Sequence, residues 1–303
     1  MQYLSLVFCL SLLLVTHAVH AEELVDDDEG QSDHENSGSW LDKITPSTHS
    51  VFMKRFEEEE GEESRYLLKT YRPNYILPYY YTGSPDYAAY ENDIPDNQTL
   101  KHSEFKGQLS IYVPLWEDIL GSSYSLQAAY TQLSYWQVYT ESQWFRETDY
   151  EPELFLTTRP HRNWLINYGL NHQSNGRGGD NERSWNRAYV DIAASGDDWV
   201  IGMRLWALIF KAQSSDIHNP DIEDYLGNSE FLVSYKLYES TLSLTARNLE
   251  RISHSALQAT WSHPVTEYLS LYAQGFSGYG QSLIEYNHHT NSFGVGFALN
   301  DWI

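Results

Sequence analysis

The chain has 303 residues, a formal net charge of −23 and a sequence pI near 4.7. That acidity argues against a nucleic-acid partner, because binding phosphates requires Lys and Arg. The single cysteine, Cys9, lies in a segment expected to be removed, which excludes a disulfide, a thiolate nucleophile and a Cys-bound metal from the mature chain. The 24 Tyr and 10 Trp residues suit an acidic soluble enzyme or a β-barrel with aromatic girdles.

Residues 1–21 are predicted to be a secretory signal peptide. Residues 4–15 form an apolar run that is too short for a spanning helix, and Val19 and Ala21 are the small residues expected before a cleavage site. The short run also disfavours a retained membrane anchor. Cys9 ends a Leu-Val-Phe-Cys sequence that faintly resembles a lipoprotein site, but it lies too early, inside the apolar run.

The next segment, 22–65, is predicted to be an acidic and mostly disordered extension. Between Glu22 and Glu63, fifteen Asp and Glu residues stand against three Lys and Arg residues. A stretch with so much charge and so few apolar side chains cannot bury enough surface to fold alone. The folded domain is therefore expected at 66–303.

Within that domain the apolar side chains recur at every second position, as in strands with one apolar face. Three clear rows are Leu109, Ile111, Val113 and Leu115; Trp199, Ile201, Met203, Leu205, Ala207 and Ile209; and Phe293, Val295, Phe297 and Leu299. Twelve strand segments are expected, near 67–82, 104–115, 124–138, 145–158, 163–174, 184–195, 198–210, 223–238, 241–249, 254–263, 268–279 and 290–301.

The predicted fold class is all-β, as a 12-stranded antiparallel transmembrane β-barrel. Many of the segments have about ten residues or more, which is the length that a tilted strand needs to cross a bilayer. The even strand number and the alternation of short turns with long loops favour the same architecture. A soluble β-sandwich is the alternative, and it explains the alternation but not the strand length.

Three polar residues continue the apolar rows of two neighbouring strands. His172 and Ser174 follow the lipid-facing positions of 163–174, and Asn186 shares the parity of the apolar row of 184–195. In a symmetric hairpin His172 lies opposite Asn186 and Ser174 opposite Ser184, with opposed Cβ atoms about 5 Å apart. All three side chains are therefore expected on the outer face of the barrel.

This set predicts acyl transfer, with Ser174 as nucleophile, His172 as proton acceptor and Asn186 orienting the imidazole. The alternative is an ordinary polar pair at a strand end. Polar groups turned toward lipid are costly without a purpose, which favours catalysis. An inert barrel or porin would instead place its polar working residues in the lumen, and a soluble esterase would not partition into membranes.

The two motifs around these residues resemble those of the outer-membrane phospholipase A family: Asn171-His172-Gln173-Ser174-Asn175-Gly176-Arg177 and Arg183-Ser184-Trp185-Asn186-Arg187. Further segments from about Leu68 to the C-terminus are similar too, among them Phe145-Arg146-Glu147-Thr148, Asn219-Pro220-Asp221-Ile222 and Ser277-Gly278-Tyr279-Gly280. The resemblance implies hydrolysis of the acyl esters of phospholipids (A1/A2 activity) and of lysophospholipids. It implies the same roles for His172, Ser174 and Asn186, together with Ca2+, an active homodimer and active sites near the outer-leaflet boundary of a Gram-negative outer membrane.

Calcium would supply the positive charge that a neutral Asn leaves missing, close to the backbone N–H of Gly176, where the oxyanion is expected. The ligands that the resemblance implies are the carbonyl of Arg177, the side chain of Glu182 and the hydroxyl of Ser142 from a second copy, with Asp216 as the monomer-state ligand. The sequence departs from the family here, because Glu182 stands where the family has Ser.

Gln132 is expected in the dimer interface by the same resemblance. The alternative is a polar strand residue that faces the lumen, and the parity of the residues around it does not decide between the two.

Overall fold

The computed structural model describes residues 68–95, 98–209 and 218–302. The expected signal peptide, the acidic extension and Asp216 lie outside the described residues. No helix in the described part of the chain has the length and apolar character to cross a membrane.

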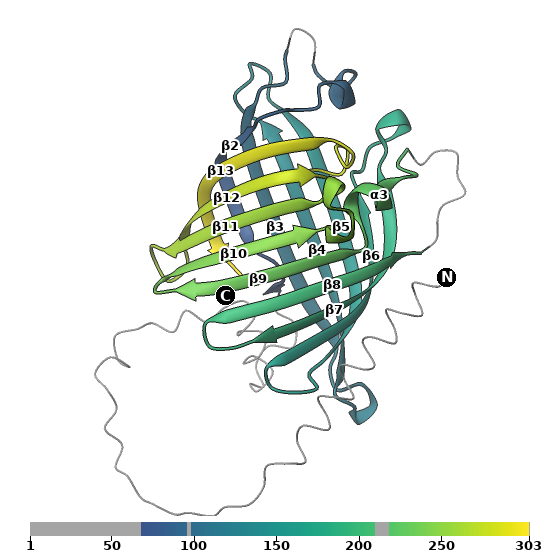
Figure 1. Cartoon of the computed structure of the whole chain (residues 1–303), viewed down its shortest axis with the longest axis vertical. Helices are drawn as coiled ribbons and strands as arrows, with labels where there is room; N and C mark the ends of the chain where they lie inside the picture. Colours follow the sequence, from purple (N-terminus) through teal and green to yellow (C-terminus); the bar gives the residue numbers. More distant parts are fainter. Residues whose placement is uncertain (1–67, 96–97, 210–217, 303) are drawn as a thin grey trace, which may run out of the picture. The chain divides into compact units, whose positions relative to one another are not determined.

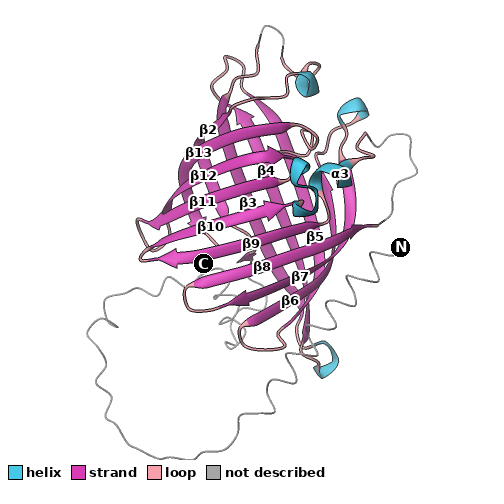
Figure 2. Ribbon diagram, in the orientation of Figure 1, coloured by secondary structure: helices cyan, strands magenta, loops and turns pink. Residues whose placement is uncertain are grey.

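The described residues form a closed antiparallel barrel of twelve strands, which confirms the predicted fold class (Figures 1 and 2). Each strand pairs with its neighbours in sequence, and β2 pairs with β13 to close the ring. The strands are β2 (Asn74–Thr82), β3 (Ser103–Trp116), β4 (Tyr124–Gln137), β5 (Trp144–Thr158), β6 (Trp164–Ser174), β7 (Ser184–Ser195), β8 (Trp199–Leu208), β9 (Ser229–Leu237), β10 (Ser240–Arg247), β11 (Ala256–Pro264), β12 (Ser270–Tyr279) and β13 (His289–Asn300).

The first expected strand, 67–82, is interrupted. A short strand β1 (Lys69–Thr70) pairs with β3 beyond the end of β2, and the residues between the two include Pro73. Proline cannot donate to a strand ladder, so the ladder breaks there. The side chain of Asn74 fills the gap, because its Nδ2 donates to the carbonyl of Ser110 at 3.0 Å.

The expected strand 223–238 is wrong in its first part. Residues Ile222–Leu226 form a short helix, α3, and strand β9 begins only at Ser229. Ile222 and Leu226 are four residues apart, which puts both on one helical face, and both are buried in one hydrophobic cluster. Gly227 then ends the helix with φ 65°.

Short 3-10 turns complete the elements: η4 (Ala88–Tyr90), η5 (Ile119–Gly121), η6 (Gly179–Asn181) and η7 (Leu249–His254). We call the end of the barrel where β2 begins and β13 ends its terminal end, since Asn74 pairs there with Asn300. The opposite, loop end carries the connections 83–102, 175–183 and 280–288.

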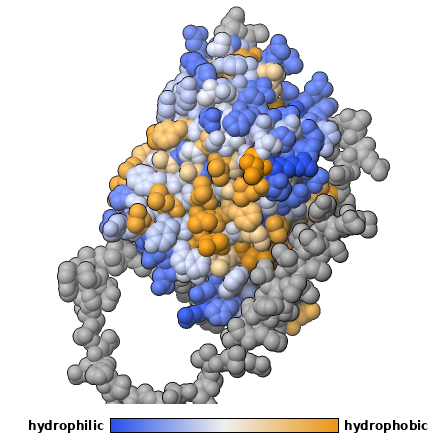
Figure 3. Space-filling view, viewed as in Figure 1, coloured by the Kyte–Doolittle hydropathy of each residue, from blue (hydrophilic) through white to orange (hydrophobic). Residues whose placement is uncertain are grey.

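The two faces of the barrel wall differ as the alternation predicts. Leu109 and Leu115 are more than half exposed on the outer face of β3, whereas Ser110 and Tyr112 of the same strand are buried in the lumen. Apolar residues gather over the strands in Figure 3, with more hydrophilic residues toward both ends. An apolar outer wall around a polar lumen is the pattern of a barrel that spans an outer membrane.

Candidate active site

The β6–β7 hairpin has the predicted register, with His172 opposite Asn186 and Ser174 opposite Ser184. Nδ1 of His172 lies 2.9 Å from Oδ1 of Asn186. Because an amide oxygen can only accept, this bond requires the imidazole proton on Nδ1 and leaves Nε2 as a proton acceptor.

The three side chains share the outer face of the barrel wall. His172, Ser174 and Asn186 are half-buried, while Asn171 and Trp185, the neighbours of opposite parity, are buried toward the lumen. Within the described residues no hydrogen bond joins Ser174 to His172. Such bonds between a nucleophile and its base are often long in a free enzyme and tighten when substrate binds.

The loop that follows Ser174 is tied together by Asn175, which sequence reasoning missed. Its Oδ1 accepts from the backbone N–H of Arg183 at 3.0 Å and of Arg177 at 3.3 Å, and its Nδ2 donates to the carbonyl of Asn181 at 2.9 Å. One buried amide therefore holds both arms of the loop 175–183. The tendency of Asn to bond its own backbone two residues on is the only sequence signal that points to this role.

Gly176 has φ 64°, in the left-handed region that favours glycine. A Cβ atom at this position would lie 2.8 Å from Cε2 of Tyr150, the residue opposite Ser174 on β5. Both the backbone angle and the neighbouring ring therefore require glycine two residues after the candidate nucleophile.

A second asparagine, Asn219, fixes the start of β7. It donates from Nδ2 to the carbonyl of Ser184 at 2.9 Å and accepts from the N–H of Ser184 at 3.1 Å. Next to it, Nδ1 of His218 lies 2.9 Å from the carbonyl oxygen of Gly179. His218 and Asn219, in the connection between β8 and β9, thus hold the loop 175–183 at Gly179 and at its junction with β7.

Two of the expected calcium ligands, Arg177 and Glu182, lie on the same loop beside Ser174. Ser142, which is expected from a second copy, is exposed on the connection between β4 and β5. Within the described ranges no three His, Cys, Asp or Glu side chains cluster to hold a metal. The available donors are backbone carbonyls, one carboxylate and a hydroxyl, all oxygen, which is the donor type that calcium prefers.

The parity of Gln132 is decided by the structure. Thr131 and Tyr135 are buried in the lumen, so Gln132 lies on the outer face, where Tyr130 donates to its Oε1 at 2.9 Å. Gln132 pairs with Tyr150, and Tyr150 with Ser174. The candidate interface residue and the candidate nucleophile therefore stand in one row across three strands.

Comparison with known proteins identifies the family of this chain. A family model described as Phospholipase A1 matches residues 52–299. The chain is 38% identical to a phospholipase A1 of Klebsiella pneumoniae over 253 residues. The matched region covers 80% of this chain and 85% of that protein. The chain belongs to the phospholipase A1 family.

Two solved structures of outer membrane phospholipases are similar over most of the chain. A Salmonella typhi dimer with bound calcium has a TM-score of 0.74 at 35% identity and covers 84% of this chain and 99% of that one. The Escherichia coli outer membrane phospholipase A has a TM-score of 0.71 at 36% identity and covers 78% of this chain and 95% of that one. This member of the phospholipase A1 family is thus a carboxylic ester hydrolase built on an outer-membrane barrel.

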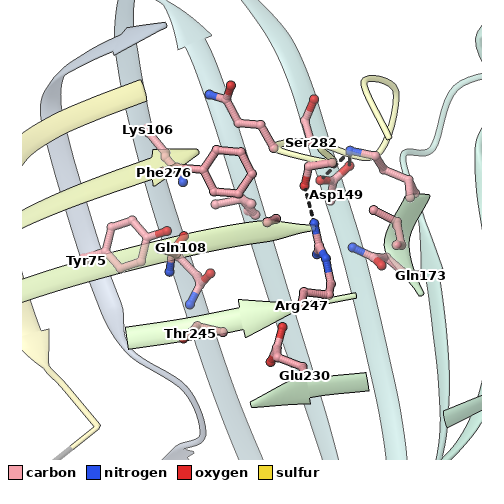
Figure 4. A pocket seen from close by; sticks show the side chains of 17 residues that line it. Tyr75, Lys106, Gln108, Asp149, Gln173, Glu230, Thr245, Arg247, Phe276 and Ser282 are labelled. Atoms are coloured by element: carbon pink, nitrogen blue, oxygen red, sulfur yellow. Dashed lines mark hydrogen bonds between the residues drawn. The ribbon is translucent and has the colours of Figure 1, made fainter. Parts of the chain in front are cut away.

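The lumen of this family member is filled by paired charges rather than by an open channel of polar side chains. Arg146 bonds Glu104 at 2.8 Å and Glu285 at 2.7 Å, and Arg187 bonds Glu151 at 2.8 Å, all of them buried. A separate cavity of about 150 Å³ is lined by residues that include Lys106, Asp149 and Arg247. Figure 4 shows these side chains turned toward it.

Proposed function

We propose that this phospholipase hydrolyses the acyl esters of phospholipids and lysophospholipids, with A1 and A2 activity, by means of Ser174, His172 and Asn186. The observation that carries the proposal is the 2.9 Å bond between Nδ1 of His172 and Oδ1 of Asn186 on the outer face. A membrane lipid can reach an outer-face hydroxyl from the bilayer, whereas it cannot reach one in a filled lumen.

The reaction follows from the orientation of the imidazole. Nε2 of His172 takes the proton of the Ser174 hydroxyl as Oγ attacks the ester carbonyl carbon, and the N–H of Gly176 donates to the oxyanion. When the acyl–oxygen bond to the lipid alcohol breaks, His172 returns the proton to that alcohol. Water then repeats the sequence on the acyl-Ser174 ester and releases the fatty acid.

Calcium is the proposed cofactor. Its ligands would be the carbonyl of Arg177, the carboxylate of Glu182 and the hydroxyl of Ser142 from a second copy, with Asp216 serving in the monomer. When bound, the ion supplies positive charge to the developing oxyanion. Calcium in the structure of the Salmonella typhi relative supports this assignment.

The proposed active form is a homodimer that meets through the outer face of β4. Gln132 stands in the same row as Ser174, so a second barrel packed there would lie beside the active site. The Salmonella typhi relative is a dimer, which supports the proposed oligomeric state. The proposed location is the outer membrane, with the catalytic residues near the outer-leaflet boundary.

The test is hydrolysis of a phospholipid in mixed micelles by the refolded full barrel with calcium. Ser174→Ala is expected to lose at least about 10³-fold in kcat, because the nucleophile acts as a unit with its base. Ser184→Ala removes the hydroxyl directly opposite and is the matched control, which should retain most activity. Full activity in Ser174→Ala would overturn the mechanism.

A second arm of the same assay tests the metal. With a strong calcium chelator the wild-type protein should fall to a small fraction of its activity, and added calcium should restore it. Activity that persists in chelator would remove calcium from the proposal and leave the serine and histidine in place.

A further inference from the structure

The loop 83–102, which joins β2 to β3, contacts the loop that carries the candidate oxyanion site. Oδ2 of Asp93 accepts a hydrogen bond from Nδ2 of Asn181 at 2.8 Å and also pairs with Nη1 of Arg177. Arg177 and Asn181 stand near the two ends of the loop 175–183. One carboxylate from a different part of the chain therefore joins both arms of that loop.

The side chain of Arg177 turns away from the outer face and is held at three points. Nε bonds Oε2 of Glu147 at 2.7 Å, Nη2 donates to the backbone carbonyl of Arg146, and Nη1 pairs with Asp93. Hydrogen bonds between charged groups are stronger and more directional than neutral ones. Fixing the guanidinium at three points restricts the backbone of Arg177 and, with it, the preceding peptide.

The preceding residue is the one that most needs such restriction. Gly176 has no side chain and a φ of 64°, a conformation that glycine leaves easily because it also populates the opposite sign. The amide N–H of Gly176 must nevertheless point in one direction if it is to stabilise an oxyanion. Asn175 bonds the two arms of the loop from within it, and Asp93 bonds them from a different connection.

We propose that Asp93 is a positioning residue, which acts through Arg177 and Asn181 to hold the Gly176 N–H in the direction that the reaction requires. This inference rests on the proposed function, since it assigns a purpose to the geometry of that site. It adds a residue from the connection between β2 and β3, which bonds Arg177 and Asn181 of the loop 175–183.

The first measurement is steady-state hydrolysis by Asp93→Ala, Asp93→Asn and Asp93→Glu at saturating calcium. The Ala variant is expected to lose about tenfold in kcat with KM changed less than about twofold, because a displaced oxyanion donor weakens transition-state binding and leaves lipid binding intact. Asp93→Glu should recover most of the loss, and Asp93→Asn, without the charge, should recover less.

Asp224→Ala is the matched control. Asp224 also forms an ion pair at the loop end of the barrel, with Arg251, but it lies on α3 and has no bond to the loop 175–183 among the described contacts. This variant should keep kcat within about twofold of the wild type, since an exposed ion pair contributes little. An equal loss in both variants would overturn the positioning role.

The second measurement does not depend on activity. Amide hydrogen exchange of the peptide that covers 175–183, recorded in chelator, should be faster in Asp93→Ala than in the wild type or Asp224→Ala. Exchange in 248–255 should not change. Wild-type exchange in 175–183 would overturn the proposal, even if Ser174→Ala confirms the proposed function, whereas an active Ser174→Ala would overturn the proposed function alone.

A folding control uses the mobility shift of folded barrels on unheated denaturing gels. If Asp93→Ala fails to fold, Asn181→Ala removes only the 2.8 Å bond to the same carboxylate and gives the same two measurements. Faster exchange with a lower kcat supports the proposal in that variant, and wild-type values in both measurements contradict it.

Discussion

The two faces of the β6–β7 hairpin differ sharply in how their side chains are held. On the outer face, the three candidate catalytic side chains have one hydrogen bond in the described structure, between His172 and Asn186. On the lumen face, Asn171 bonds Glu151 at 3.0 Å and Arg187 bonds the same carboxylate at 2.8 Å. The outer face carries reactive groups with spare hydrogen-bonding capacity. The inner face carries groups that are held by several charged hydrogen bonds, although Nε of Arg187 and the hydroxyl of Tyr189 are left without a partner in the described structure.

The outer-face residues are therefore suited to catalysis and the lumen-face residues to holding the strands in place. A nucleophile and its base must exchange protons and partners during a reaction, so they cannot be fixed by many permanent bonds. The side chains of opposite parity on the same strands can be fixed, and removing one partner of a buried ion pair is strongly destabilising because it leaves an uncompensated buried charge. Outer-face substitutions should therefore change kcat, and lumen-face substitutions should change the free energy of unfolding.

The largest expected effect that sharpens this comparison is that of Asn186→Ala. Loss of the bond to Nδ1 lets the imidazole of His172 adopt the wrong tautomer or rotate, and kcat should fall about 10- to 100-fold. The free energy of unfolding should change by less than about 0.5 kcal/mol, because the residue lies on the outer wall. Both quantities are measured on the same refolded protein, by hydrolysis and by guanidinium titration. A wild-type kcat would show that Asn186 does not orient the base.

Gly176→Ala should change both kcat and the free energy of unfolding. The loop 175–183 follows Ser174 on the outer face and is also bonded to the inner network through Arg177 and Glu147. The φ of 64° and the ring of Tyr150, 2.8 Å from the new methyl, should together cost about 1–3 kcal/mol, and kcat should fall about tenfold as the N–H turns. Gly275→Ala on β12 is the matched control, since its methyl would meet open space. A Gly176→Ala protein as stable and active as the control would contradict the close approach of Tyr150.

Much of this comparison was predictable from the sequence, because parity is a local property. The alternation placed His172, Ser174 and Asn186 on the outer face and gave the right register for the hairpin. The same alternation failed at 223–228, where the spacing of Ile222 and Leu226 is helical and their partners lie in the distant loop 280–288.

The supports of the site could not be predicted, because they come from segments that only the closed barrel brings together. Asp93 is 84 residues away from Arg177 in sequence, and Asn219 is 35 residues away from Ser184. A long loop has no periodic pattern, so the sequence does not predict which residue a polar side chain in it will contact. The parity of Gln132 also stayed undecided in sequence, since both rows of its strand mix polar and apolar residues.

The smallest expected effect concerns Glu285, in the loop 280–288, which belongs to the inner network. Burial alone would raise the pKa of its carboxyl, but the charge of Arg146 and a bond from the Ser282 hydroxyl outweigh burial and hold the pKa below its ordinary value of 4.5. A carboxyl with a depressed pKa in the folded protein contributes stability above pH 4.5. That contribution is lost as the pH falls through the lower, folded-state value.

Glu285→Gln should therefore lower the free energy of unfolding by about 1.5–3 kcal/mol at neutral pH, the contribution of a hydrogen bond to a charged group. The difference from the wild type should shrink steadily as the pH falls below 4.5 and vanish once the wild-type carboxyl is also neutral. Guanidinium titrations of both proteins across this pH range measure the difference in the free energy of unfolding.

The kcat of Glu285→Gln at neutral pH should stay within about threefold of the wild type. Arg146 keeps its bond to Glu104, and the carbonyl of Arg146 still accepts from Arg177. A difference that does not depend on pH would mean that the shape of Glu285, rather than its charge, supports the loop. A large loss of kcat would show that the inner network and the outer chemistry are less separable than the two faces of the hairpin indicate.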